Sequence, residues 1–192
     1  PGAMRNATKK DFKDIYYNPM SQGTRCHQLA TYIVYDSPLT MLCDNPTIYR
    51  KEQECTSFIA SLPDETDETR ILQGEMGKYI VSAKRKGNNW YIGALTNWNK
   101  RDIEVSLSFL SENVTYKAEI FSDGKNANKQ AQDYKHETQY LTRDSVLKIH
   151  LAEGGGFAIS LEKENNIKVT SVPASLHINS FYKKYVDANG IP

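Results

Sequence analysis

Two different periods of apolar residues divide the chain. In roughly the first sixty residues the apolar side chains recur at steps of three and four, which is the repeat of an amphipathic helix. From about Thr69 onward they alternate with polar residues, as in a strand with one buried face. The change predicts a helical segment followed by an all-β region.

Three helices are expected in the first part. Thr24 is a suitable N-cap for the first, which Pro38 ends because proline disfavours helical backbone in the residue before it. Asn45 and Pro46 give a capping residue and a proline at the first helical position of the second. Residues 52–62 form the third. The predicted inward side chains are Cys26, Leu29, Ala30, Ile33 and Val34 in the first helix, and Cys55, Phe58, Ile59 and Leu62 in the third.

The second part predicts an antiparallel β-sandwich. Residues 79–86 and 90–96 are β-rich runs around a short Gly/Asn turn, which is typical of a hairpin. Short strands spaced about ten residues apart favour a sandwich. The further predicted strands are 103–109, 115–121, 138–141, 146–151 and 157–161.

Polar stretches mark the boundaries. The acidic run 64–68 is interpreted as a solvated linker, and residues 1–22 as irregular. After a polar stretch at 162–175, residues 180–186 predict a short amphipathic helix. The chain is therefore divided into 1–69, 70–163 and 164–192.

Composition excludes several classes of protein. The 24 basic and 23 acidic residues nearly cancel, so a nucleic-acid partner is not expected. No run of 18 apolar residues indicates a membrane span. Cys26, Cys43 and Cys55 form neither a disulfide framework nor a CxxC zinc motif, and are interpreted as small buried thiols.

Catalytic chemistry has weak support. A glycosidase needs two carboxyl groups facing one another, whereas Glu52 and Glu54 are two residues apart on a predicted helix and diverge. His27 lies beside the first apolar stripe and is expected to pack or hydrogen-bond rather than catalyse, and His150 is expected at the surface of a strand. We assign no catalytic, cofactor-binding or metal-ligating residue.

Two loops resemble ligand-binding motifs. Residues 154–156 are three glycines, but a strand and no Lys-Ser/Thr pair follows, so a hairpin turn is preferred to a phosphate loop. Residues 123–128 have oxygen ligands but fail the EF-hand pattern at Lys125, Asn128 and Tyr134. An ordinary loop is preferred there to a calcium site of another kind.

Trp90, Tyr91 and Trp98 leave an alternative function open. Alternation places Trp90 and Ile92 on one face of their strand and Tyr91 on the other, so at least one ring is expected in the core. Exposed rings could stack on sugars. The chain could then be a stand-alone carbohydrate-binding module, or a generic adhesion-type sandwich.

Several long stretches resemble the C-terminal region of glycoside hydrolase family 97. The resemblance covers residues 1–163 almost continuously. Its segments are PGAMRNATK at 1–9, NPMSQGTRCHQLATYIVYDSPLTMLCDNPTIY at 18–49, ECTSFIASLPDETDETRIL at 54–72, GKYIVSAKRKGNNWYIGALTNW at 77–98, IFSDGKNANKQAQDYK at 120–135 and LAEGGGFAISL at 151–161.

The resemblance implies a mainly β fold: a C-terminal antiparallel β-sandwich preceded by a helical remnant of the end of a (β/α)₈ barrel. It also implies a parent with an N-terminal domain and a catalytic barrel, which hydrolyses terminal α-glucosyl or α-galactosyl residues. Such parents are commonly calcium-dependent and exported to the periplasm. The family's catalytic carboxylates precede the stretch that begins here at PGAM, so this segment is expected to be inactive and to take part in self-association. Residues 164–192 depart from the family pattern and are expected to lead into an additional or truncated segment.

Overall fold

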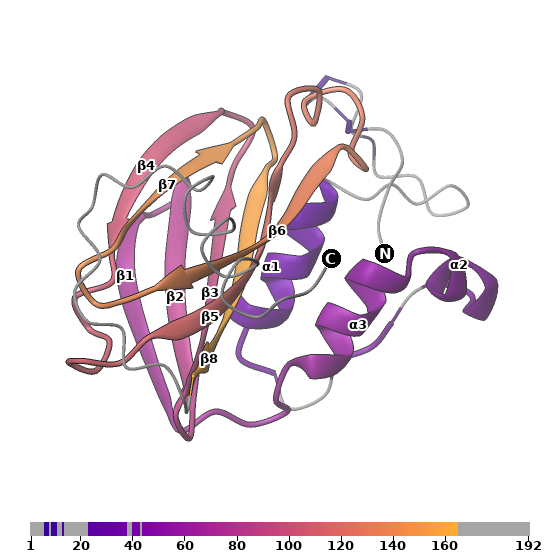
Figure 1. The fold of residues 1–192 in the computed structure, drawn as a ribbon. Helices are drawn as coiled ribbons and strands as arrows, with labels where there is room; N and C mark the ends of the chain where they lie inside the picture. Colours follow the sequence, from indigo (N-terminus) through magenta and orange to yellow (C-terminus); the bar gives the residue numbers. More distant parts are fainter. Residues whose placement is uncertain are drawn as a thin grey trace, which may run out of the picture.

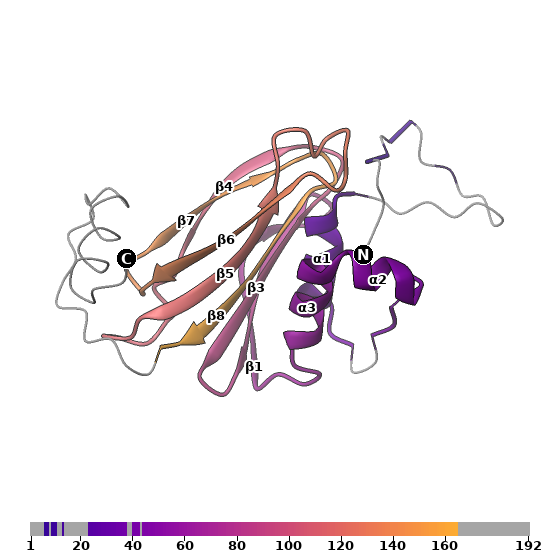
Figure 2. The same cartoon turned by 45° about the vertical axis from the view of Figure 1, so that its right-hand side comes forward.

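A computed structural model describes residues 6–7, 9–10, 13, 23–37, 40–42 and 44–164 as three layers. Helices lie on one side of a large antiparallel sheet, and a small sheet lies on the other (Figures 1 and 2). The helices are α1 (Arg25–Val34), α2 (Pro46–Lys51) and α3 (Gln53–Ser61). The strands are β1 (Glu68–Glu75), β2 (Tyr79–Lys86), β3 (Asn89–Thr96), β4 (Arg101–Ser106), β5 (Tyr116–Asp123), β6 (Tyr134–Leu141), β7 (Val146–Leu151) and β8 (Gly156–Lys163).

The large sheet has six strands in the order β1-β2-β3-β8-β5-β6, and the small sheet pairs β4 with β7. All neighbouring strands are antiparallel. The β7 side chains alternate strictly between exposed and buried, because only one face of the small sheet meets the core. Strands β3 and β8 are buried on both faces, because each lies between the helices and the small sheet.

A first hydrophobic core fills the space between the two sheets. It contains Trp90 and Ile92 of β3, Tyr116 of β5, and alternate residues of β4 and β7. Side chains from all the central strands meet there, so this core closes the sandwich.

A second core joins the helices to the opposite face of the large sheet. Its members include Leu29 and Ile33 of α1, Phe58 of α3, and Tyr91 and Phe121 of the sheet. Helix α1 lies across β3 and β8 (Figure 2). The apolar stripe predicted for the first helix therefore packs on the sandwich.

Local signals in the sequence are confirmed. The Thr24 hydroxyl accepts a hydrogen bond from His27 N at the start of α1, and Asn45 caps α2 with Pro46 in its first turn. In the third helix Cys55 and Phe58 are buried, and Ile59 and Leu62 pack against the same core. The hairpin predicted at 79–86 and 90–96 matches β2 and β3.

Three strand predictions need correction. The turn at 154–156 is not a hairpin, because β7 and β8 belong to different sheets. The strand predicted at 103–109 ends at Ser106, although Leu107 remains buried. Strand β6 begins at Tyr134 rather than 138, because residues 135–140 are exposed and show no apolar alternation.

The acidic run is only partly a solvated linker. Asp67 and Glu68 pair with Arg85 of β2, and β1 begins at Glu68. The sequence pattern did not predict β1 as a strand of its own. Cys43, Pro38, most of residues 1–22 and the predicted helix at 180–186 lie outside the described residues, and the three-part division of the chain stays a prediction.

Candidate functional site

The N-terminus of α1 rests on the loops at one end of the sandwich. Thr24 N donates to Gly154 O at 3.0 Å, and Arg25 N donates to Ala131 O at 2.8 Å. The first backbone N–H groups of a helix have no partner within the helix, so these loop carbonyls and the Thr24 cap satisfy them. We call Asn6, Thr24–His27, Asp123 and Gly154–Gly156 the anchor site.

Asp123 connects three parts of the anchor site. Its Oδ2 accepts hydrogen bonds from Ala152 N at 2.9 Å and Gly156 N at 3.1 Å. The carboxyl is 6% exposed, and burial raises its pKa, while hydrogen bonds from Thr24 and these two N–H groups act in the opposite direction. One oxygen of this buried carboxylate thus binds the backbone of two positions in the crossing from β7 to β8, which is a structural role.

Two glycines allow this close contact. A Cβ on Gly155 would lie 2.1 Å from Asp123 Oδ2, and one on Gly156 would lie 2.4 Å from the backbone N of His27. The three-glycine sequence therefore serves backbone packing between α1 and the crossing from β7 to β8. It has no helix behind it and does not form a phosphate loop.

Asn6 ties the segment before α1 to the same loops. Its side-chain amide donates to Ala127 O at 3.0 Å and to Glu153 O at 2.6 Å, and its backbone N donates to Lys129 O at 3.1 Å. The residue is 4% exposed. Two loops far apart in the sequence are thereby joined by a residue outside the sandwich.

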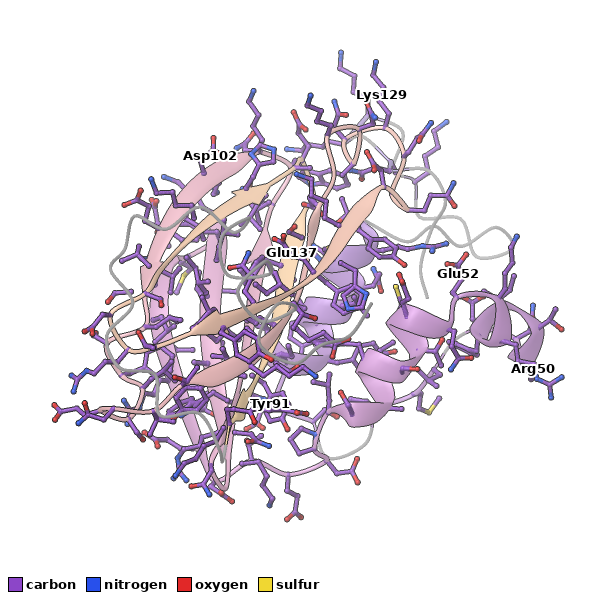
Figure 3. All side chains as sticks on the ribbon, viewed as in Figure 1. Arg50, Glu52, Tyr91, Asp102, Lys129 and Glu137 are labelled. Atoms are coloured by element: carbon purple, nitrogen blue, oxygen red, sulfur yellow. The ribbon has the colours of Figure 1, made fainter. Side chains whose placement is uncertain are left out.

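A bidentate ion pair joins α1 to the α2–α3 junction. Arg25 Nη1 lies 2.5 Å from Glu52 Oε2, and Arg25 Nη2 lies 3.1 Å from Glu52 Oε1. The Arg25 side chain is 5% exposed, and its hydrogen bonds lower the pKa of Glu52. Figure 3 shows Glu52 at the start of α3.

A second polar contact joins α3 to the sheet edge. Tyr134 Oη donates to Glu54 Oε2 at 2.9 Å, and His136 lies between Glu54 and Glu119. The His136 ring also stacks on Phe121, with 4.2 Å between ring centroids. Glu52 and Glu54 thus serve different contacts, which agrees with their predicted divergence.

Four described carboxyl groups have a resolved pKa shift, and only that of Asp123 is raised. A general acid needs a raised pKa beside a carboxylate that stays ionised. The pKa of Glu52, Asp67 and Glu68 is lowered, in each case chiefly by a hydrogen bond: from Arg25, from Gly87 N and from Arg70 respectively. Asp123, whose pKa is raised, has its carboxylate bonded to buried backbone.

His27, His150 and Trp90 lie in three different environments. His27 is half-buried, and its Nδ1 lies 3.2 Å from Gly155 O, so it hydrogen-bonds as expected. Burial lowers its pKa. His150 is exposed beside Asp102. Trp90 is 4% exposed and packs edge-on against Phe109, which excludes it as a sugar platform.

The acidic, histidine and cysteine side chains of the described residues do not gather into a metal-binding cluster. No group of three or more His, Cys, Asp or Glu side chains among these residues is placed to hold an ion. The loop after Asp123 is closed by Asp133, which accepts from Asn126 N and, through its carbonyl, from Gly124 N. Cys26 and Cys55 are buried free thiols, and burial raises the pKa of both.

A polar groove of about 470 Å³ lies between the C-terminal ends of α1 and α3 and the strands β1 and β2. Lys84, 5% exposed, lies in its wall and donates to Tyr35 O at 2.8 Å. Tyr91, labelled in Figure 3, also lines it. Two of the acidic side chains along the groove, Asp67 and Glu68, are already paired with cations of β2.

The sequence did not reveal Asp123 or Asn6 as structural residues. The sequence around Asp123 predicts an ordinary solvated loop in preference to a calcium site, and neither reading makes Asp123 a buried contact. A signal was present, since a carboxylate ending one apolar strand and three glycines before another are both suited to buried turns. The contact between this carboxylate and the glycine segment depends on the order of strands in the large sheet, which the sequence pattern does not specify.

No described helix is both long and apolar enough to cross a membrane.

Comparison with known proteins identifies the relatives of this arrangement. Residues 65–162 match the family model described as glycosyl-hydrolase 97 C-terminal, oligomerisation. A retaining alpha-galactosidase of Bacteroides thetaiotaomicron is 52% identical over 161 residues, which are 84% of this chain and 24% of that protein. A probable retaining alpha-galactosidase of Streptomyces bingchenggensis is 26% identical over 131 residues, or 68% and 19% of the two chains.

Solved structures agree. A glycoside hydrolase family 97 enzyme from Pseudoalteromonas sp. strain K8, in complex with acarbose, superposes with a TM-score of 0.72 at 34% identity. The match covers 74% of this chain and 23% of that one. The chain thus spans about a quarter of the length of such relatives, and it belongs to glycoside hydrolase family 97, as the C-terminal region of such an enzyme.

Proposed function

We propose that this region fixes the position of a catalytic domain and holds copies of the enzyme together, without catalysing the reaction itself. The second core carries the proposal: α1 and α3 share it with the sandwich. A barrel that continues into these helices would be held on the sheet through the anchor site. The Arg25–Glu52 pair would hold α1 to the α2–α3 junction.

The whole enzyme would hydrolyse terminal α-galactosyl residues, with α-glucosyl residues as the second substrate class. The relative named a retaining alpha-galactosidase, at 52% identity, supports the first choice. Calcium dependence and export to the periplasm belong to the same proposal. No cluster of three or more acidic, histidine or cysteine side chains occurs among the described residues, and the proposal assigns the calcium ion to the catalytic domain.

An activity assay tests the non-catalytic role. The 192-residue chain, incubated with aryl α-galactosides and α-glucosides with and without calcium, is expected to release no product. The reason is that Asp123, the described carboxyl whose pKa is raised, is buried and bonded to backbone N–H groups, away from solvent and substrate. Saturable turnover by a clean preparation would contradict the proposal.

Self-association is tested separately. Sedimentation velocity over a wide range of chain concentration is expected to show a mass that rises above that of one chain. The description of the matching family as an oligomerisation domain supports this expectation. A constant monomer mass at every concentration would remove self-association from the proposed role.

A sugar titration addresses the alternative of a carbohydrate-binding module. Maltooligosaccharides are expected to leave tryptophan fluorescence unchanged, because Trp90 is buried in the first core. A saturable change would restore the alternative, with the half-buried Trp98 as the residue to substitute first.

A further inference from the structure

Strand β6 is an open edge of the large sheet. No strand in the described part of the chain pairs with its outer side (Figure 1). Residues 135–140 are all exposed, and the strand contains neither proline nor glycine. Such an edge presents unpaired backbone N–H and C=O groups, to which another strand can add.

The opposite edge, β1, is protected. Its register with β2 shifts between Ile71 and Gln73, which places a bulge at Leu72. The Gln73 side chain also donates to Glu104 O of β4. Bulges are one means by which edge strands avoid pairing. Strand β6 pairs with β5 in unbroken register along its full length, so it remains regular and able to pair.

One face of β6 carries the charges that would select a partner. Leu141 points into the first core, so Lys135, Glu137 and Gln139 lie on the same face by alternation. All three are exposed, and Figure 3 shows Glu137 on β6. The other face is engaged near its start, where Tyr134 and His136 contact α3.

We propose that β6 pairs antiparallel with β6 of a second copy of this chain, in the register that places Lys135 opposite Glu137 of that copy. The pairing is centred on His136, and two-fold symmetry then makes the ion pair twice. A register centred on Glu137 would oppose two like charges. This inference rests on the proposed self-association and assigns it a surface.

Charge reversal tests the register. Lys135→Glu or Glu137→Lys would turn both ion pairs into repulsions, and each single variant is expected to raise the dimer dissociation constant roughly tenfold. An equimolar mixture of the two variants, and the double variant K135E/E137K, are both expected to recover wild-type association, because opposite charges again face each other. Sedimentation velocity of the 192-residue chain measures all four samples.

A matched control uses another exposed cross-strand pair. Glu104 and Lys148 face each other on the small sheet, 3.7 Å apart, and their reversal is expected to leave association unchanged. Thermal unfolding followed by circular dichroism should be the same for all variants, because the substituted side chains are exposed.

The two proposals can fail separately. If the wild type self-associates and the β6 variants match it, or if the mixture does not recover association, the β6 interface is wrong and self-association stands. If the wild type is monomeric at every concentration, the proposed self-association itself is wrong, and β6 pairing with it. Recovery in the mixture and in the double variant supports pairing between chains, because a segment of the same chain covering β6 could not produce it.

Discussion

Arg25 shows how much of the attachment between the helices depends on single side chains. Its guanidinium is almost fully buried, and Glu52 is the carboxylate that pairs with it. Removing one partner of a buried ion pair leaves an uncompensated charge, which costs more than the pair contributes relative to apolar residues. Glu52 lies at the surface end of the pair, so water reduces this penalty.

Glu52→Gln is expected to lower the free energy of unfolding by about 1–3 kcal/mol at pH 7. The folded-state pKa of Glu52 is lowered, so its stabilisation is complete above the unfolded pKa of about 4.3 and is lost as pH falls through the folded value. The difference between wild type and variant should therefore shrink in acid. Urea unfolding at neutral and acid pH measures it, with the exposed Glu65→Gln as the control.

At the scale of elements, the first residue of β8 and the first turn of α1 are in close backbone contact, with no room between them for a side chain. Gly156 lies against the backbone of Cys26 and His27, and its N–H is held by Asp123. The start of the helix is thus positioned by a strand rather than by another helix. Closely packed interiors respond to an added methyl group by shifting backbone, which is destabilising.

Gly156→Ala is expected to destabilise the chain by roughly 1–3 kcal/mol, because the new Cβ would lie 2.4 Å from His27 backbone atoms. Gly74→Ala on the edge strand β1 is the matched control, since its Cβ would meet Tyr79 O at 3.3 Å. Thermal unfolding compares the two. Equal losses of stability would show that the α1–β8 contact is not the cause.

Across the whole molecule, the two cores lie on opposite faces of one sheet. Tyr91 belongs to the helix side and Trp90 to the sandwich side of the same strand, β3. Loss of β3 would expose both cores together. The helices and the sandwich are therefore expected to form a single cooperative unit.

Leu29→Ala should lower the midpoint of thermal unfolding for helix and sandwich together. Leu29 is 1% exposed, and loss of a buried leucine costs about 2–5 kcal/mol. Far-UV circular dichroism follows the helices, and tryptophan fluorescence follows the sandwich core. Two separate midpoints in the variant would show that α1 unfolds independently of the sheet.

Prediction from sequence succeeded where the determinants are local. Thr24, Asn45 and Pro46 cap helices through neighbouring residues, and the hairpin of β2 and β3 follows from alternation around a short turn. The pairing of β8 between β3 and β5 depends on residues distant in sequence, so local sequence alone favours a hairpin at the glycine turn where the chain in fact crosses between sheets. The structural role of Asp123 could not be predicted for the same reason. Its hydrogen-bond donors, Ala152 N and Gly156 N, are distant in sequence and become its neighbours only through the order of strands in the sheet.

The seating of α1 also determines how the molecule would carry mechanical load. Tension applied on the N-terminal side of α1 reaches the sandwich loops through Asn6, which is bonded to Lys129 O and Glu153 O. It also reaches them through Thr24 and Arg25, whose N–H groups are bonded to Gly154 O and Ala131 O. Those two loops adjoin β8 and β6, so the force is shared between separate strands of one sheet. It would not peel a single strand from its neighbour one hydrogen bond at a time. A load applied at the start of α1 is therefore distributed over the large sheet.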